Sequence, residues 1–166
     1  MTDILRIFFI VLMLTVTLAA YFLVVGALFA HRVAKTQSII NQTPGRAFGL
    51  GLVNFLFFGT IAFILLTLID GNANRVNEIL RVILFFPTVG VLAFLGVLLS
   101  FGMAGMVKEL GARIVPEQEP RRQLLIGSVI LVFACALPFV GWFLLLPYIS
   151  FVGIGATILG FFQRAS

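Results

Sequence analysis

Residues 47–69, with the sequence AFGLGLVNFLFFGTIAFILLTLI, contain no ionisable side chain over 23 positions. A helix rises about 1.5 Å per residue, so roughly 20 residues cross the hydrocarbon layer of a bilayer, which is about 30 Å thick. Inside that layer every backbone amide and carbonyl needs a partner within the segment, and a helix supplies it. The segment therefore predicts one membrane-spanning helix.

Three more uncharged apolar blocks accompany this one, at residues 7–30, 82–107 and 124–162. Hydrophobic residues make up 61% and charged residues 10% of the chain, and the mean hydropathy is +1.20, outside the range of ordinary soluble domains. The first block is longer than the apolar core of a secretory signal, and no small-x-small cleavage site precedes His31. We therefore expect an integral membrane protein whose first block is a retained helix.

The last block is too long for a single crossing. As one helix its 39 residues would run roughly 58 Å, nearly twice the hydrocarbon thickness. The sequence LPFVGW at 137–142 offers a break, because Pro138 removes a backbone donor, Gly141 permits a turn and Trp142 favours the membrane interface. We expect a tight hairpin between Pro138 and Gly141, and a kinked helix with a re-entrant end is the alternative.

Together the blocks predict an all-α fold, a polytopic transmembrane helical bundle that forms a single integral membrane domain over residues 1–166. About five membrane-spanning helices are expected, at about 7–30, 47–69, 82–107, 123–137 and 142–163. The fourth of these is short, so Arg121 and Arg122 would have to extend toward the interface or the bilayer would have to thin locally.

Lysines and arginines are unevenly distributed over the predicted connections. With five crossings one side carries the 31–46 loop, the 108–123 loop and the C-terminus, with Arg32, Lys35, Arg46, Lys108, Arg113, Arg121, Arg122 and Arg164, and the other side carries Arg6, Arg75 and Arg81. Because positively charged loops stay in the cytoplasm, we expect a multi-pass protein of the cell inner (plasma) membrane with its N-terminus outside and its C-terminus cytoplasmic. The net charge of +5 then reflects orientation and attraction to anionic lipid headgroups. No basic run is interleaved with aromatic residues, so a nucleic-acid partner is not expected.

Proline positions indicate where helices begin. Thr43 places a capping hydroxyl before Pro44 at a first helical position, so the second helix should start near Pro44. Over 71–86 apolar and charged side chains fall on different helical faces, which favours a separate interfacial helix leading to Pro87. The alternative is a third helix that starts near Asn77 and kinks at Pro87.

Small side chains recur at spacings of three and four along two predicted helices. They are Gly90, Ala93, Gly96, Ser100 and Ala104 in the third helix, and Ser150, Gly153, Ala156 and Gly160 in the fifth. Such stripes let helix backbones approach closely, and in lipid this packing replaces the hydrophobic drive that holds soluble bundles together. We expect the third and fifth helices to touch each other, or one of them to face a partner protein.

Acidic and basic side chains are missing from the apolar blocks. All six acids lie outside them, namely Asp3, Asp70, Glu78, Glu109, Glu117 and Glu119. Proton pumps, ion-coupled carriers and voltage sensors place such groups at membrane depth, so a self-contained coupled transporter is not expected. A Ser-His-Asp site also fails, because His31 and Asp70 end loops on opposite faces of the membrane. We expect the chain not to be an enzyme.

Three side chains remain as candidates for other roles. Asn54 is the strongest polar group at membrane depth and should hydrogen-bond to a neighbouring helix, with contact to a quinone, lipid or pigment headgroup as the alternative. His31, the only histidine, should contact lipid headgroups, and the sharper alternative is an axial ligand of a haem or chlorophyll-type pigment. Cys135 is the only cysteine and should behave as a small apolar residue. We predict no cofactor and no metal site.

Five short motifs lie between about 43 and 160: TPGR at 43–46, FPTVG at 86–90, ELGAR at 109–113, LPFVGW at 137–142 and VGIGA at 152–156. Together they resemble the multi-helix membrane region attached to some bacterial polymer-forming, bactofilin-type proteins. The resemblance implies a bacterial inner-membrane protein with an anchoring or scaffolding role and no catalytic residues. The soluble β-helical polymerising domain is not found in this sequence, so polymer formation is not implied.

Two classes of function follow from these features. We favour a non-enzymatic structural or accessory subunit, or scaffold, that packs with a larger membrane complex or with itself and holds lipid or pigment in phenylalanine-rich grooves. The alternative is an oligomeric pore or small-molecule permease, because Asn54 and helices broken near Pro87 and Pro138 would offer polar groups to a solute. An intramembrane enzyme comes third, and the sequence holds no catalytic constellation for it.

Overall fold

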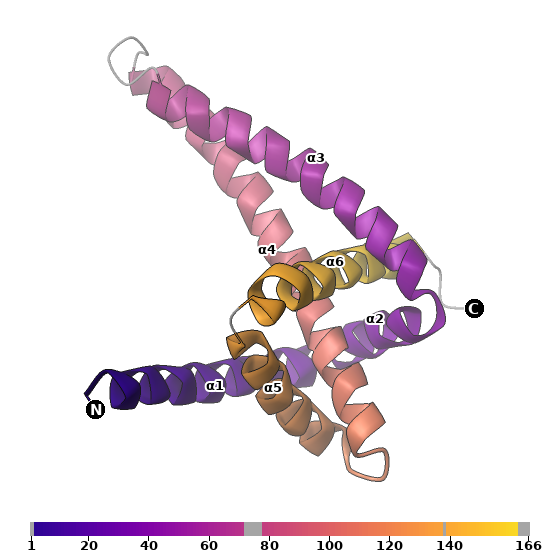
Figure 1. Cartoon of the computed structure of the whole chain (residues 1–166). Helices are drawn as coiled ribbons and strands as arrows, with labels where there is room; N and C mark the ends of the chain where they lie inside the picture. The colour runs from indigo at the N-terminus through magenta and orange to yellow at the C-terminus, as the bar shows by residue number, and fades with distance from the viewer. Residues whose placement is uncertain (1, 72–77, 138, 163–166) are drawn as a thin grey trace.

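The protein is a set of packed helices. A computed structural model describes residues 2–71, 78–137 and 139–162, and over these residues it contains helices and no strand. In chain order the elements are α1 (Thr2–Leu28), α2 (Ala30–Gln42), α3 (Pro44–Gly71), α4 (Glu78–Ile114), α5 (Pro120–Ala136), a π-helical turn η1 (Val140–Leu145) and α6 (Leu146–Phe162) (Figure 1). The predicted all-α fold is confirmed.

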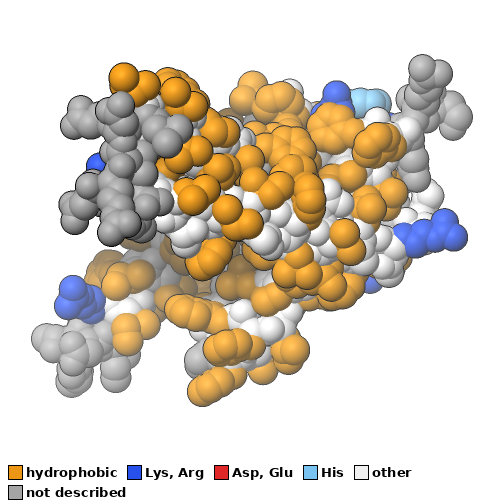
Figure 2. Space-filling view, turned by 90° about the horizontal axis from the view of Figure 1, so that it is seen from above, with side chains coloured by type: hydrophobic (Ala, Val, Ile, Leu, Met, Phe, Trp, Pro, Cys, Tyr) orange, Lys and Arg blue, Asp and Glu red, His pale blue; other side chains and the backbone are white. Residues whose placement is uncertain are grey.

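Among the residues that the structure describes, four helical segments are long and apolar enough to cross a membrane. They are Leu5–Leu28, Pro44–Ile69, Arg81–Ile114 and Val140–Phe162. Hydrophobic side chains cover much of the middle of one face of the molecule, and lysine, arginine and histidine side chains lie toward its edges (Figure 2). Apolar groups that face outward suit a lipid environment, as expected for a multi-pass membrane protein.

The predicted fifth crossing corresponds to α5, which is shorter than these four segments. Its 17 residues rise about 26 Å, and two arginines lie in its first turn. In Figure 1, α5 runs back from the end of α4, and α6 then leaves the end of α5 at a wide angle to it. The crossing by α5 stays a prediction.

The chain changes direction between α5 and η1, where the sequence predicts a hairpin. Pro138 lies outside the described residues, and Phe139 adopts a positive φ of 66° with ψ of −65°. Gly141 is buried against the end of α5, and a Cβ there would lie 2.5 Å from the carbonyl oxygen of Cys135. The second arm differs from the expectation, because it begins with the π-helical turn η1 and becomes α-helical only at Leu146.

The first connection is a helix and not the predicted loop. The 31–46 segment contains most of α2, while α3 starts at Pro44 as predicted. Val33, Thr36 and Ile40 recur at helical spacing and are all buried. The polar composition of α2 suggested a loop, but this one face is covered by α4 and α6 and holds the segment as a helix.

The helix α4 is continuous through Pro87. The predicted separate interfacial helix is therefore wrong, and the alternative of a single helix is right from Glu78 onward. The expected kink at Pro87 stays a prediction, and Asn77 lies outside the described residues. In the turn at Pro87, which lacks an amide donor, the Thr88 hydroxyl donates to the Leu84 carbonyl at 2.7 Å. The helix also runs seven residues past the expected end at 107, so the first part of the predicted 108–123 loop is helical.

The last helix, α6, is the centre of the bundle. Residues 152–157 are all buried, and 44% of the most apolar stretch of Val140–Phe162 is buried against 6% for that of Pro44–Ile69. It contacts α2, α3 and α4, and in Figure 1 it lies between α3 and α2. The surrounding helices therefore take their positions from α6.

Candidate functional site

Glycines make the close crossings around α6. At the crossing of α3 and α6, Gly51 lies against the backbone of Phe151 and Gly155. At the crossing of α4 and α6, a Cβ at Gly153 would lie 2.8 Å from the backbone of Gly102. A side chain at either crossing would push the two helices apart, so these positions require glycine.

The predicted stripe on α6 lies largely inside the bundle. Gly153, Ala156 and Gly160 are buried and Ser150 is half-buried. The structure brings α4 and α6 together, but through Gly102, which is not part of the predicted α4 stripe. Sequence reasoning missed Gly102, although its spacing from Gly105 gives a second series of small residues on α4.

The predicted stripe on α4 is divided. Toward the C-terminus Ala104 is fully buried, and Ser100 accepts a hydrogen bond from the Tyr21 hydroxyl of α1 at 2.6 Å. Toward the N-terminus Gly90, Ala93 and Gly96 are exposed, and a Cβ at either glycine would have no heavy atom within 4 Å. We call these three residues the open face of α4.

A polar cluster closes the end of the bundle where α2 meets α4. Glu109 accepts a hydrogen bond from Arg113 Nε at 2.8 Å and another from Gln37 Nε2 at 3.2 Å. The Glu109 side chain is only 8% exposed, whereas that of Arg113 is 65% exposed. Gln123 of α5 donates to two carbonyls of the α4–α5 turn at 3.3 Å. These bonds satisfy a buried carboxylate and fix the start of α5 against α4.

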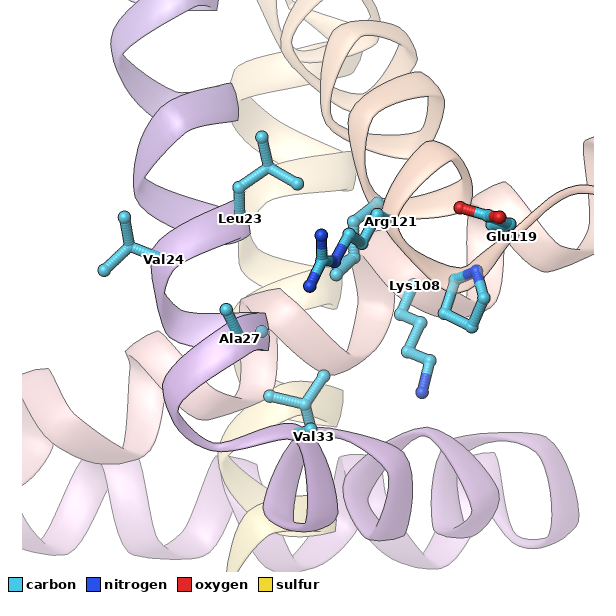
Figure 3. Close-up of a pocket in the computed structure, with 11 residues that line it drawn as sticks. Leu23, Val24, Ala27, Val33, Lys108, Glu119 and Arg121 are labelled. Carbon is cyan, nitrogen blue, oxygen red and sulfur yellow. The ribbon is translucent and has the colours of Figure 1, made fainter.

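A groove of about 710 Å³ opens beside this cluster, between α1, α2, α4 and the start of α5 (Figure 3). Its uncharged lining residues are Leu23, Val24, Gly26, Ala27, Ala30, Val33, Pro120 and Leu124. Its charged lining residues are Lys108, Arg121 and Glu119. In Figure 3 the Arg121 guanidinium reaches toward α1, and Lys108 extends from α4. The groove therefore combines an apolar wall with two cations and one carboxylate.

Local backbone features position this groove. α1 meets α5 where Gly26 faces Leu124, and a Cβ at Gly26 would lie 2.5 Å from the Leu124 Cδ1 atom. Phe29 separates α1 from α2 with φ of −123° and ψ of 39°, so the chain turns away at this level. The close approach of α1 to α5 and the turn at Phe29 bring the end of α1 and the start of α2 to the same groove.

The other predicted site residues lie apart from the groove. His31 is exposed on the first turn of α2, next to Arg32, whose guanidinium lies 4.6 Å from the centre of an aromatic ring of α6. Asn54 donates at 2.9 Å to a carbonyl one turn earlier in α3, and not to a neighbouring helix. Cys135 is a half-buried free thiol in α5. Within the described part of the chain, no three His, Cys, Asp or Glu side chains are close enough to hold a metal ion.

Comparisons of the chain with protein-family models, with curated proteins and with solved structures give no match. The resemblance of the five motifs to bactofilin-type membrane regions therefore stays a prediction. Inferences about function rest on the geometry of the open face and of the groove.

Proposed function

We propose that the chain is a non-enzymatic structural or accessory subunit of a membrane, which packs with a larger membrane complex or with copies of itself. The observation that supports this proposal is the open face of α4. Small residues at a spacing of three let a second helix approach closely, and close packing between backbones is what associates helices in lipid. The inner half of the same stripe is already used for packing inside the bundle.

The N-terminal part of α1 supports the same proposal. Residues 5–10 are all exposed, and six residues cover more than one helical turn. This part of α1 therefore presents much of its apolar surface outward, and it projects from the bundle in Figure 1. A second membrane protein, or a second copy, would find two apolar surfaces to pack against.

We further propose that the protein belongs to a bacterial inner (plasma) membrane, with the N-terminus outside and the polar cluster facing the cytoplasm. The support is the positive charge of one end of the bundle. Arg32 on α2, Lys108 on α4 and Arg121 on α5 lie toward the same end, and positively charged ends of membrane helices stay in the cytoplasm.

Purification from the native membrane in a mild detergent tests the proposed subunit role. Proteins that co-migrate are identified by mass spectrometry, and the absorption spectrum of the same fraction reports any pigment. We expect a defined partner or a discrete oligomer. A solitary monomer would count against the proposal.

A pair of variants assigns this association to the open face. Gly96→Leu places a large side chain on the open face, at a position where a Cβ would have no heavy atom within 4 Å. It should abolish co-migration, because the partner backbone can no longer approach. Gly59→Leu is the matched control, since a Cβ at Gly59 of α3 would also have no heavy atom within 4 Å, and Gly59 lies outside the open face. Equal co-migration of the two variants would remove the open face from the proposal.

A further inference from the structure

We propose that the groove between α1, α2, α4 and α5 binds one anionic phospholipid of the surrounding bilayer. Its phosphate would lie between Lys108 and Arg121, and an acyl chain would follow the wall formed by α1 (Figure 3). This site goes beyond the proposed subunit role and does not depend on a protein partner.

The groove has the polarity of a phospholipid along its length. Leu23, Val24 and Ala27 belong to the apolar segment Leu5–Leu28, which is long enough to cross the membrane. Lys108 lies near the end of α4, and Arg121 lies in the first turn of α5. The apolar wall therefore meets acyl chains, while the two cations meet headgroups.

The charges of the groove are available for a ligand. Lys108 is half-buried, and neither Lys108 nor Arg121 has a hydrogen-bond or ion-pair partner among the described residues. The neighbouring Arg122 differs, because it donates to Gln118 at 3.1 Å and does not line the groove. Basic pockets between transmembrane helices bind anionic headgroups in this way.

Charge balance favours a lipid with one net negative charge. Two cations and the Glu119 carboxylate give the groove a net charge of +1, the complement of a phosphatidylglycerol headgroup. Glu119 would accept hydrogen bonds from the glycerol hydroxyls, while the cations neutralise the phosphate. A zwitterionic phosphatidylcholine has no hydroxyl donor for Glu119 and leaves the net positive charge unmatched.

Native mass spectrometry of the full-length protein tests this site. The delipidated protein is titrated with phosphatidylglycerol or with phosphatidylcholine that carries the same acyl chains. We expect preferential binding of one phosphatidylglycerol, and we expect Lys108→Gln and Arg121→Gln each to weaken it about fivefold, the effect of one cation near a membrane surface. Arg122→Gln is the matched control and should bind as the parent does.

A further variant tests whether the acyl chain binds along the apolar wall, and it does so without changing either cation. Ala27→Leu adds a larger side chain to the apolar wall, narrows the groove and retains every charge. It should therefore also weaken phosphatidylglycerol binding. Variants are compared only when their helical circular dichroism and elution volume match those of the parent.

Three results would overturn the proposal. Equal binding of phosphatidylcholine would show that the groove does not distinguish lipids by the charge of their headgroup. If Arg121→Gln and Arg122→Gln weakened phosphatidylglycerol binding equally, the lipid would be attracted by the overall positive charge of this end of the bundle and not by the groove. Displacement of the lipid by millimolar inorganic phosphate would show that the cations bind free phosphate and that the apolar wall contributes nothing.

Discussion

Glu109 joins α4 to α2, because its two carboxylate oxygens accept from Arg113 and from Gln37. Glu109→Ala leaves both donors without this acceptor, and we expect the free energy of unfolding to fall by about 1–3 kcal/mol. Thermal unfolding in detergent, followed by circular dichroism, measures the change. The control is Glu117→Ala, which removes an exposed carboxylate of the α4–α5 turn and should change stability by less than about 0.5 kcal/mol. Equal losses in the two variants would contradict the structural role of Glu109.

Gly155 tests the close crossing of α3 and α6. A Cβ at Gly155 would overlap the backbone of Ala47, so Gly155→Ala should destabilise the bundle by about 1–3 kcal/mol through overpacking. Gly59→Ala is the matched control in open space, and it should be neutral or stabilise α3 by about 0.5–1 kcal/mol, because alanine favours a helix. Unfolding in detergent gives both values. A lower free energy of unfolding for Gly155→Ala alone supports the crossing, whereas a higher free energy of unfolding for both variants would disprove it.

Single residues show the limit of sequence reasoning at the candidate site. The spacing of small residues predicted faces that suit close packing, and Gly153 and Ala156 are indeed buried. The spacing does not predict which helix packs against a given face, so the contact at Gly102 was missed. Glu109 was expected in a loop, and its burial depends on where α2 lies in three dimensions, which no local pattern contains.

At the scale of elements, Phe139 controls the turn between α5 and η1. Its φ of 66° and ψ of −65° fall in the strained γ-turn region, and the residue is 78% exposed. Phe139→Gly and Phe139→Ala both delete this side chain, but only glycine removes the backbone strain. We expect the glycine variant to be more stable than the alanine variant by about 1 kcal/mol, the reverse of their order in a helix. Unfolding in detergent measures the difference, and a more stable alanine variant would contradict the turn geometry.

Element boundaries could be predicted where the signal is local. Pro44 fixed the expected start of α3, and the length of the last apolar block required a change of direction near Gly141. The signals failed where packing decides the structure. α2 looked like a loop because its polar residues hide one buried face, and α4 crosses Pro87 because a long apolar helix tolerates one missing donor.

At the scale of the whole molecule, the number of crossings depends on α5. If α5 crosses the membrane, its two ends face opposite sides. In a Cys135→Ser background, Gln118→Cys should react with a membrane-impermeant thiol reagent from one side and Trp142→Cys from the other. Thr43→Cys, at the start of α3, is the control and should react from the same side as Gln118→Cys. Reaction of Gln118→Cys and Trp142→Cys from one side would reduce the count to four.

The proposed subunit role requires that the open face of α4 meets another protein in the membrane. A photo-crosslinking amino acid placed at Gly96 in the native membrane tests this contact, with Phe63, an exposed residue of α3, as the comparison position. We expect a discrete protein adduct from position 96, either a second copy or a different subunit, and mainly lipid adducts from position 63. Lipid adducts alone from both positions would contradict the proposed contact.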